Sequence, residues 1–132
     1  MIKGLTHVAL RVGDIEESIR FYCNILGLKE KFRLKNEKGD PILVYIQVAP
    51  RQFIELFPGA EGKYCDTKTS GLVHICLEVD DIQTAYQEMQ ARGLVPTGEP
   101  ICAGDNSWQF WTKDPDGNPI EFHQFTPESM QL

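Results

Sequence analysis

Two stretches of the chain alternate between apolar and more polar residues in the period-2 pattern of a half-buried β-strand. They are Leu5–Val12 and Val73–Val79. In each stretch every second residue is a branched apolar one, and a histidine, His7 or His74, stands on the opposite face. The apolar faces consist of Val8, Leu10 and Val12 in the first stretch and of Ile75, Leu77 and Val79 in the second.

A helical pattern follows each of these strands. Asp14 is expected to cap the first helix, and Glu17, three residues further on, completes a capping-box pattern. Asp81 or Asp80 is expected to cap the second helix. Each apolar stripe ends at a glycine, which suits a C-terminal cap. The stripes with their glycines are Ile15, Ile19, Tyr22, Leu26 and Gly27, and Ile82, Ala85, Tyr86, Met89 and Gly93.

Three more strands are expected after each helix. The turns Asn36–Asp40 and Asp114–Asn118 precede the later strands, and the second turn is a strong hairpin signal. The expected strands are Lys29–Leu34, Ile42–Val48 and Gln52–Phe57 in the first half, and Val95–Glu99, Trp108–Lys113 and Pro119–Phe125 in the second.

The order βαβββ therefore occurs twice, and this predicts an α+β fold. Module one takes about residues 1–60, a linker rich in Gly, Lys and Thr takes about 58–70, and module two takes about 71–126. Together they are expected to form a single domain over residues 1–132. We predict a cupped, mixed eight-stranded sheet with the helices outside.

Composition narrows the class of partner. The 132 residues carry a formal net charge of −6 without any run of Lys or Arg, so a nucleic-acid or anionic-membrane surface is not expected. No apolar stretch has transmembrane length, and residues 1–4 leave no room for a signal peptide, which predicts a cytoplasmic protein. The four cysteines show no CxxC spacing and are expected to be reduced and mostly to serve packing; they are Cys23, Cys65, Cys76 and Cys102.

The chain repeats a His and a Glu as well as its core pattern. His7 and His74 occupy the same place in the two alternating strands, and Glu55 and Glu121 each follow the helix-ending glycine by 28 residues. A duplicated scaffold repeats its core but has no structural need to repeat these two residue types. Neutral imidazoles with carboxylates suit Ni²⁺, Zn²⁺, Co²⁺, Mn²⁺ or Fe²⁺. The four residues therefore predict a site for one divalent metal ion.

Strand periodicity gives the direction of the carboxylates. Glu55 shares a face with Phe53 and Phe57, whereas the residues between them suit the layer beneath the helix. The four ligands are therefore expected to face away from the helices, into a cavity. The alternative is that each His is an ordinary strand residue and each Glu lies on a solvent face; the duplicated placement favours metal binding.

Other residues on these faces leave alternatives open. Arg11, on the His7 face, is either an exposed strand residue or an anion contact. His123, on the Glu121 face, is a support for that carboxylate, a proton shuttle or, as its place near the terminus favours, an exposed residue. Arg11 and His123 are the candidate substrate-binding residues. Trp108 and Trp111 lie on opposite faces and are expected to pack, with one of them facing the cavity or solvent.

From end to end the chain resembles the vicinal oxygen chelate (VOC) superfamily, and most closely its glyoxalase I (lactoylglutathione lyase) branch. The resemblance implies that His7, Glu55, His74 and Glu121 hold the metal, with Ni²⁺ or Zn²⁺ favoured. It also implies a homodimer, with the site either shared between chains or closed within one. The motifs that carry it are His7–Asp14, Ser18–Tyr22, Phe53–Leu56, His74–Asp81 and Asp114–Phe122.

The resemblance also implies a reaction. A hemithioacetal or small α-oxygenated carbonyl compound bound to the metal has an acidic C–H, because the ion stabilises the enediolate that forms. Glu121 is implied as the base that moves the proton, with Glu55 as a possible partner. The expected activity is that of a metal-dependent lyase or isomerase on a small molecule or its thiol adduct.

Two departures concern glutathione. Gly59 stands where glyoxalase I has an Asn, and residues 103–107 contain no Lys or Arg where that family has a basic loop. Arg11 matches the family's contact to the γ-glutamyl carboxylate. Alternative functions are another VOC metalloenzyme, either an epimerase or a dioxygenase, and a metal-free binding or resistance protein. Glu55 counts mildly against the first two, and the intact ligand set counts against the last.

Overall fold

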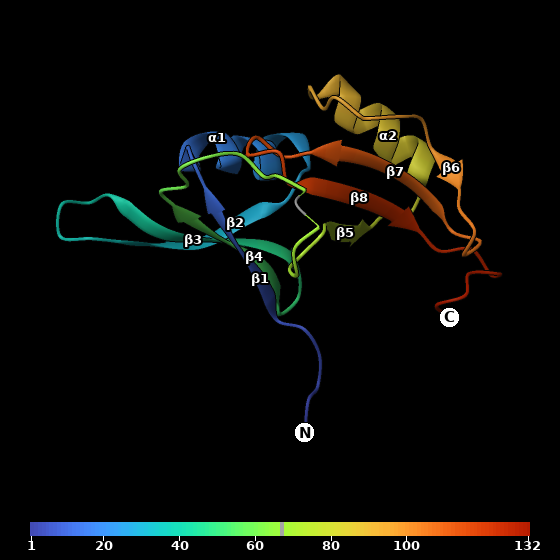
Figure 1. The fold of residues 1–132 in the computed structure, drawn as a ribbon, viewed down its shortest axis with the longest axis horizontal. Helices are drawn as coiled ribbons and strands as arrows, with labels where there is room; N and C mark the ends of the chain where they lie inside the picture. Colours follow the sequence, from blue (N-terminus) through green and yellow to red (C-terminus); the bar gives the residue numbers. More distant parts are fainter. Residues whose placement is uncertain (67) are drawn as a thin grey trace. The chain divides into compact units, whose positions relative to one another are not determined.

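The fold was analysed in a computed structural model that describes residues 1–66 and 68–132. The chain divides into two compact units, Met1–Lys63 and Tyr64–Leu132 (Figure 1). Each unit contains a four-stranded mixed sheet and has the element order βαβββ. The predicted fold class is therefore confirmed.

In the first unit the strands follow the order β1-β4-β3-β2, with β1 parallel to β4 and the remaining pairs antiparallel. The register places Ala9 on one side of Glu55 and Tyr45 on the other. The elements are β1 (His7–Val12), α1 (Ile15–Ile19), the π-helix η1 (Arg20–Ile25), β2 (Lys29–Lys35), β3 (Pro41–Ala49) and β4 (Gln52–Pro58).

The second unit repeats this topology as β5-β8-β7-β6, with β5 parallel to β8. Here Cys76 and Trp111 flank Glu121. Glu55 and Glu121 thus sit at equivalent places, each in a strand with a neighbour on either side. The elements are β5 (Ile75–Glu78), α2 (Ile82–Ala91), β6 (Ile101–Cys102), β7 (Trp108–Lys113) and β8 (Pro119–Gln124).

The helix ends follow the sequence signals. An oxygen of Asp14 accepts hydrogen bonds from the backbone N–H groups of Glu16 and Glu17, each at 3.0 Å. Asp81 is the cap of α2, since it accepts from Thr84 N at 2.7 Å. The two glycines that end the helical segments have φ values of 81° and 105°, the left-handed conformation that glycine adopts most readily (Gly27 and Gly93).

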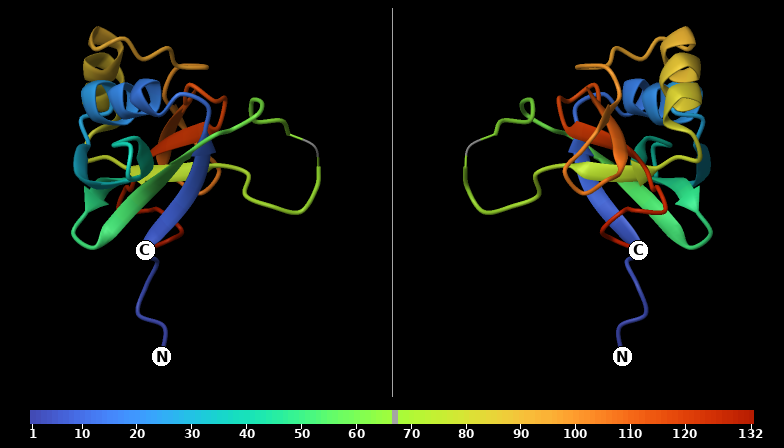
Figure 2. Two further views of the ribbon diagram at one scale, coloured as in Figure 1. Left: turned by 90° about the vertical axis from the view of Figure 1, so that its left-hand side faces the viewer. Right: turned by 90° about the vertical axis from the view of Figure 1, so that its right-hand side faces the viewer.

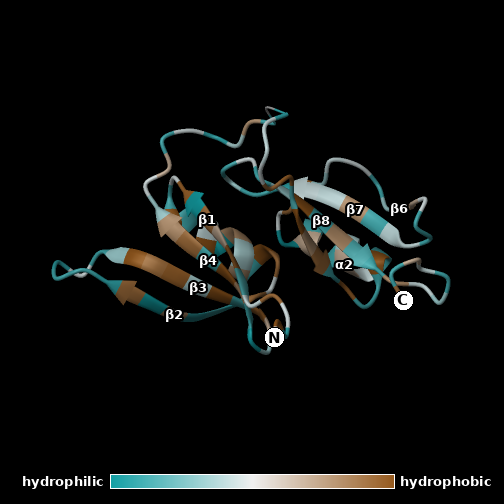
Figure 3. Cartoon of the chain, turned by 60° about the horizontal axis from the view of Figure 1, so that its bottom comes forward, coloured by the Kyte–Doolittle hydropathy of each residue, from teal (hydrophilic) through white to brown (hydrophobic). Residues whose placement is uncertain are grey.

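Each helical segment lies on one face of its own sheet, and the core lies between them (Figure 2). Strands β3 and β4 carry long apolar stretches, whereas the turns at their ends are polar (Figure 3). Alternate strand residues are almost wholly buried on the helix side: Val44, Ile46, Ile54 and Leu56 in the first unit, and Phe110, Ile120 and Phe122 in the second. The candidate ligands belong to the opposite face.

One predicted strand is wrong. Residues 95–99 form no strand, and the strand nearest to that stretch is the short β6. Pro96 and Pro100 lack the N–H that a sheet ladder requires. The segment nevertheless follows β7, because Thr97 N donates to Trp111 O at 2.8 Å and Thr112 Oγ1 donates to Val95 O at 2.8 Å.

All four cysteines are free, as expected. The prediction that they mostly serve packing is wrong, because only Cys23 is half-buried while Cys65, Cys76 and Cys102 are exposed. Within residues 1–66 and 68–132, the helices are too short to cross a membrane.

Candidate metal centre

The first unit joins His7 to Glu55. His7 opens β1 and Glu55 lies in the parallel neighbour β4, so their side chains meet diagonally on one face of the sheet. His7 Nε2 lies 3.2 Å from Glu55 Oε2. The carboxylate is only 8% exposed, while the imidazole is open to solvent. The pair therefore offers one nitrogen and one oxygen ligand from the solvent side.

Tyr45 fixes the Glu55 carboxylate. It faces Glu55 across β3 and β4 and hydrogen-bonds to it; burial first, and then this bond, raise the pKa of Tyr45. Phe32 stacks on the Tyr45 ring at 4.5 Å between centroids. His7 meets the same ring edge-on at 5.8 Å. Tyr45 was not predicted as a site residue, because the hydrophobic pattern of a strand does not show which residues of the neighbouring strand it pairs with.

The second unit builds the same pair from His74 and Glu121. His74 immediately precedes β5, Glu121 lies in β8, and His74 Nε2 is 3.0 Å from Glu121 Oε2. Trp111 takes the place that Tyr45 has in the first unit and meets the His74 ring edge-on at 4.7 Å. Of the two tryptophans, Trp111 is therefore the one that faces the candidate ligands.

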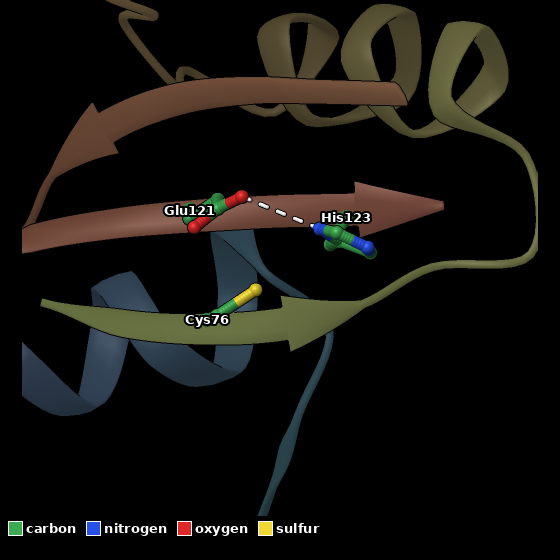
Figure 4. A group of neighbouring side chains, drawn as sticks. All are labelled: Cys76, Glu121 and His123. Carbon is green, nitrogen blue, oxygen red and sulfur yellow. Dashed lines mark hydrogen bonds and ion pairs between the residues drawn. The ribbon is translucent and has the colours of Figure 1, made fainter. Parts of the chain in front are cut away.

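Glu121 has further polar neighbours. Its Oε1 lies 3.3 Å from His123 Nδ1, and the ligand atoms of Cys76, Glu121 and His123 all lie within 4.8 Å of one another (Figure 4). Packing around the sulfur, and then the charge of Glu121, raise the pKa of the Cys76 thiol to about 12. Cys76 was not among the predicted site residues.

The favoured prediction that His123 is exposed is wrong. The residue is only 7% exposed. It lies on β8, which has β5 on one side and β7 on the other, so its closeness to the end of the chain does not expose it. Its ring also meets Phe125 edge-on at 4.7 Å. His123 is therefore a buried neighbour of the Glu121 carboxylate on the same face of the sheet.

The distances suit metal ligands. Two donor atoms that lie about 2.0–2.2 Å from one ion, at tetrahedral or octahedral angles, are separated by about 2.9–3.5 Å. The separations of 3.2 Å for His7 with Glu55 and 3.0 Å for His74 with Glu121 fall in this range. Each unit thus brings one predicted pair together, and joint binding of one ion by both pairs stays a prediction.

Arg11 is tied to the end of the neighbouring strand. Its Nη1 donates to Pro58 O at 3.2 Å, and its guanidinium lies over the Phe57 ring, 5.9 Å from the centroid. The residue is exposed, so the remaining donors of its fork are open to solvent. An anion contact by Arg11 stays a prediction.

Comparison with known proteins identifies the family. The model of the glyoxalase/bleomycin resistance protein/dioxygenase superfamily matches residues 4–122, and the chain belongs to this superfamily. A Bacillus subtilis protein named YwbC and described as uncharacterized is 33% identical over 94% of this chain and 99% of its own length. The lactoylglutathione lyase of Neisseria meningitidis serogroup A is 32% identical over 91% of this chain and 89% of its own.

Solved structures agree on the fold. SMU.1112c superimposes with a TM-score of 0.81 at 25% identity, covering 93% of this chain and 99% of that one. A lactoylglutathione lyase from Agrobacterium tumefaciens has a TM-score of 0.70 at 22% identity over 93% of this chain and 94% of that one. The fosfomycin resistance protein FosX from Listeria monocytogenes has a TM-score of 0.71 at 19% identity over 98% and 99%. At such identities the last two likenesses concern the fold alone.

Proposed function

We propose that this protein is a divalent-metal-dependent lyase or isomerase of the glyoxalase I type, acting on a hemithioacetal or a small α-oxygenated carbonyl compound. The observation that carries the proposal is the duplicated contact between a His Nε2 and a Glu Oε2, at 3.2 Å in one unit and 3.0 Å in the other. Relatives named lactoylglutathione lyase, which match nearly the whole chain, support the same reaction class.

In this proposal His7, Glu55, His74 and Glu121 are the ligands. A divalent ion held by these residues would supply Lewis-acid chemistry, which makes the C–H beside a carbonyl group acidic. Each imidazole presents Nε2 toward a carboxylate oxygen, and an ion bound by Nε2 would leave the proton of the neutral imidazole on Nδ1. Neutral His with carboxylate is the protonation state that metal binding requires.

Glu121 is proposed as the base, which takes a proton from the substrate carbon and returns it to the neighbouring carbon. The two carboxylates differ in their support. Glu55 receives a hydrogen bond from the Tyr45 hydroxyl, which favours a fixed ligand role. Glu121 instead has His74 at one oxygen and His123 at the other. We propose that it gives up one of these contacts when it turns toward the substrate.

The test is Glu121→Gln, which keeps the size of the side chain and one ligand oxygen but removes its basicity. Metal content should persist while turnover falls by roughly 10²–10⁴, the range expected for a general base. Turnover is measured with methylglyoxal plus glutathione and with a panel of hemithioacetals and α-hydroxycarbonyl compounds, at equal metal loading. The matched variant Glu55→Gln should lose less turnover, because Glu55 is assigned to binding.

His74→Ala supplies the control for the ligand assignment. The side chain faces away from the core, so circular dichroism should be unchanged while elemental analysis shows loss of metal. Equal metal in the wild type and His74→Ala contradicts the ligand set. Absence of turnover with every compound of the panel, from fully metallated wild type, contradicts the enzyme proposal itself.

A further inference from the structure

We propose that Cys76, Glu121 and His123 form a second metal site, confined to the second unit, for a thiolate-preferring divalent ion such as Zn²⁺ or Co²⁺. The inference goes beyond the proposed function, which uses Glu121 but assigns no ligand role to Cys76 or His123. It requires no residue of the first unit.

Strand pairing brings the three donors together. Cys76 on β5 is directly paired with Glu121 on the parallel strand β8, and His123 follows two residues later on the same face. Their sulfur, oxygen and nitrogen ligand atoms lie within 4.8 Å of one another. The Cys76 sulfur is directed toward the space between the other two side chains (Figure 4).

The spacing within the cluster suits a shared ion. His123 Nδ1 and Glu121 Oε1 are 3.3 Å apart, which is the separation expected of two ligands about 2.0–2.1 Å from one tetrahedral ion. Cys76 is exposed, so an ion has access to this edge of the cluster from solvent. Binding of one ion by all three donors requires the Cys76 and Glu121 side chains to rotate so that the sulfur comes closer to the other two ligand atoms.

His123 is a buried imidazole with one nitrogen turned toward the cluster. The side chain is more than nine-tenths buried, and its Nε2 is without a hydrogen-bond partner among the described residues. The nitrogen that faces the cluster is Nδ1, which lies 3.3 Å from Glu121 Oε1. Nδ1 is therefore the proposed donor, and Nε2 then carries the single ring proton.

The duplicated fold does not account for the cluster. The residues of the first unit at the places of Cys76 and His123 are Ala9 and Phe57, by the register around Glu55. Neither of these can bind a metal. The two added donors are therefore specific to the second unit and are not a by-product of the repeated core.

The donor set selects the class of ion. A thiolate with an imidazole and a carboxylate suits Zn²⁺ or Co²⁺, whereas Mg²⁺, Ca²⁺ and Mn²⁺ prefer oxygen ligands. On binding, the S–H bond of Cys76 breaks, its proton passes to solvent and a sulfur–metal bond forms, without any change of oxidation state. Glu121 belongs to both ligand sets, so an ion held here competes with His74 for that carboxylate.

The test uses Co²⁺ added to the reduced, full-length apoprotein under exclusion of oxygen. Thiolate ligation produces a sulfur-to-cobalt charge-transfer band in the near ultraviolet, which His and carboxylate ligands do not give. The band is expected in the wild type and in His7→Ala, and it should disappear in Cys76→Ser. The matched control is Cys102→Ser, which removes another exposed cysteine of the same unit and should retain the band.

A second measurement concerns His123. Because its burial makes truncation disruptive, His123→Asn is compared with His123→Phe, and both are checked for folding by circular dichroism. Each folded variant should bind Co²⁺ at least tenfold more weakly at the band-forming site.

Three results would overturn the inference: a wild type that binds Co²⁺ without the band, a band retained in Cys76→Ser, or a band lost in Cys102→Ser. The first of these leaves the proposed function standing, since binding then uses other ligands. A wild type that binds no Co²⁺ at all overturns both. Retention of the band in His7→Ala together with loss of turnover shows two separable sites.

Discussion

The two candidate carboxylates hold equivalent places in the duplicated fold but have different surroundings. Glu55 lies between Ala9 and Tyr45, while the same positions beside Glu121 are Cys76 and Trp111. His7 and the Tyr45 hydroxyl contact the first carboxylate, whereas His74 and His123 contact the second. The duplicated fold thus provides one His–Glu pair per unit, and the residues around the two carboxylates differ.

Two buried serines allow a matched test of how single polar groups affect stability. Both are fully buried, but Ser107 Oγ bonds to Ser129 Oγ at 2.6 Å, whereas Ser18 Oγ has no hydrogen-bond partner in the part of the chain described. Ser107→Ala should lower the free energy of unfolding by about 0.5–1.5 kcal/mol, because it removes this hydrogen bond while Ser129 Oγ keeps its contacts with Thr126 N and Asn106 O. Ser18→Ala should leave it unchanged or raise it by up to about 1 kcal/mol.

Urea denaturation of the two variants beside the wild type gives both values. A loss above about 1 kcal/mol in Ser18→Ala would show that its hydroxyl is satisfied in solution.

At the level of elements, the sequence predicts what periodicity and capping determine. The alternation at β1 and the carboxylate caps of both helices are observed, and β7 has the predicted bounds, Trp108–Lys113. The stretch 95–99 was wrongly predicted to be a strand. Its apolar residue is followed directly by a proline, which has no N–H to donate to a sheet ladder. The change from α-helix to the π-helix η1 was not predicted from the 3.6-residue stripe. The π-helix has a wider turn, and Phe21, which lies outside that stripe, is buried beside Tyr22.

The candidate site was also predicted only in part. Each His and Glu of a pair could be found because duplication marks them twice. Tyr45 and the clustering of Cys76 with His123 could not, because both depend on which residues face each other across strands far apart in the chain. His123 was misjudged for a related reason, as β8 follows β7 in the chain but lies between β5 and β7 in the sheet.

The cap of α2 should make stability depend on acid. Hydrogen bonds from Thr84, chiefly its backbone N–H, lower the pKa of Asp81. A carboxylate whose pKa is lower in the folded than in the unfolded protein stabilises the fold above its unfolded pKa of about 3.9, and this stabilisation is lost as the pH falls through the folded value. Asp81→Asn keeps a good N-cap but does not titrate.

Chemical denaturation is followed at about pH 7 and about pH 3, on either side of the unfolded pKa. The wild type should lose more stability on acidification than Asp81→Asn does, so the difference between them should shrink or reverse at the lower pH. Equal acid sensitivity of the two proteins contradicts a contribution from the ionised cap.

On the scale of the whole molecule, we expect net charge to affect which thiol adducts the proposed enzyme uses. The net charge is −6, and the only charged residue of the 103–107 loop is Asp105. Hydrogen bonds from Gln131 and then from Ser107 N lower the pKa of Asp105, so the loop is negative at neutral pH. Arg11 is the one cation on the His7 face of β1, and part of its donor capacity is already used by Pro58 O.

Glutathione adducts carry two carboxylates and one ammonium group. Their net negative charge is therefore repelled by the net negative charge of the protein. Salt screens such repulsion over the Debye length, about 8 Å at 0.15 M. We therefore expect kcat/KM for the glutathione hemithioacetal of methylglyoxal to rise by roughly two- to tenfold between low salt and 0.15 M. The hemithioacetal of an uncharged thiol such as 2-mercaptoethanol should show little change, and should be used at least as well at low salt.

Initial rates measured for both adducts over a salt series make the comparison. A fall in efficiency with salt for the glutathione adduct alone would show that Arg11, and not the net charge, governs how the anionic substrate binds.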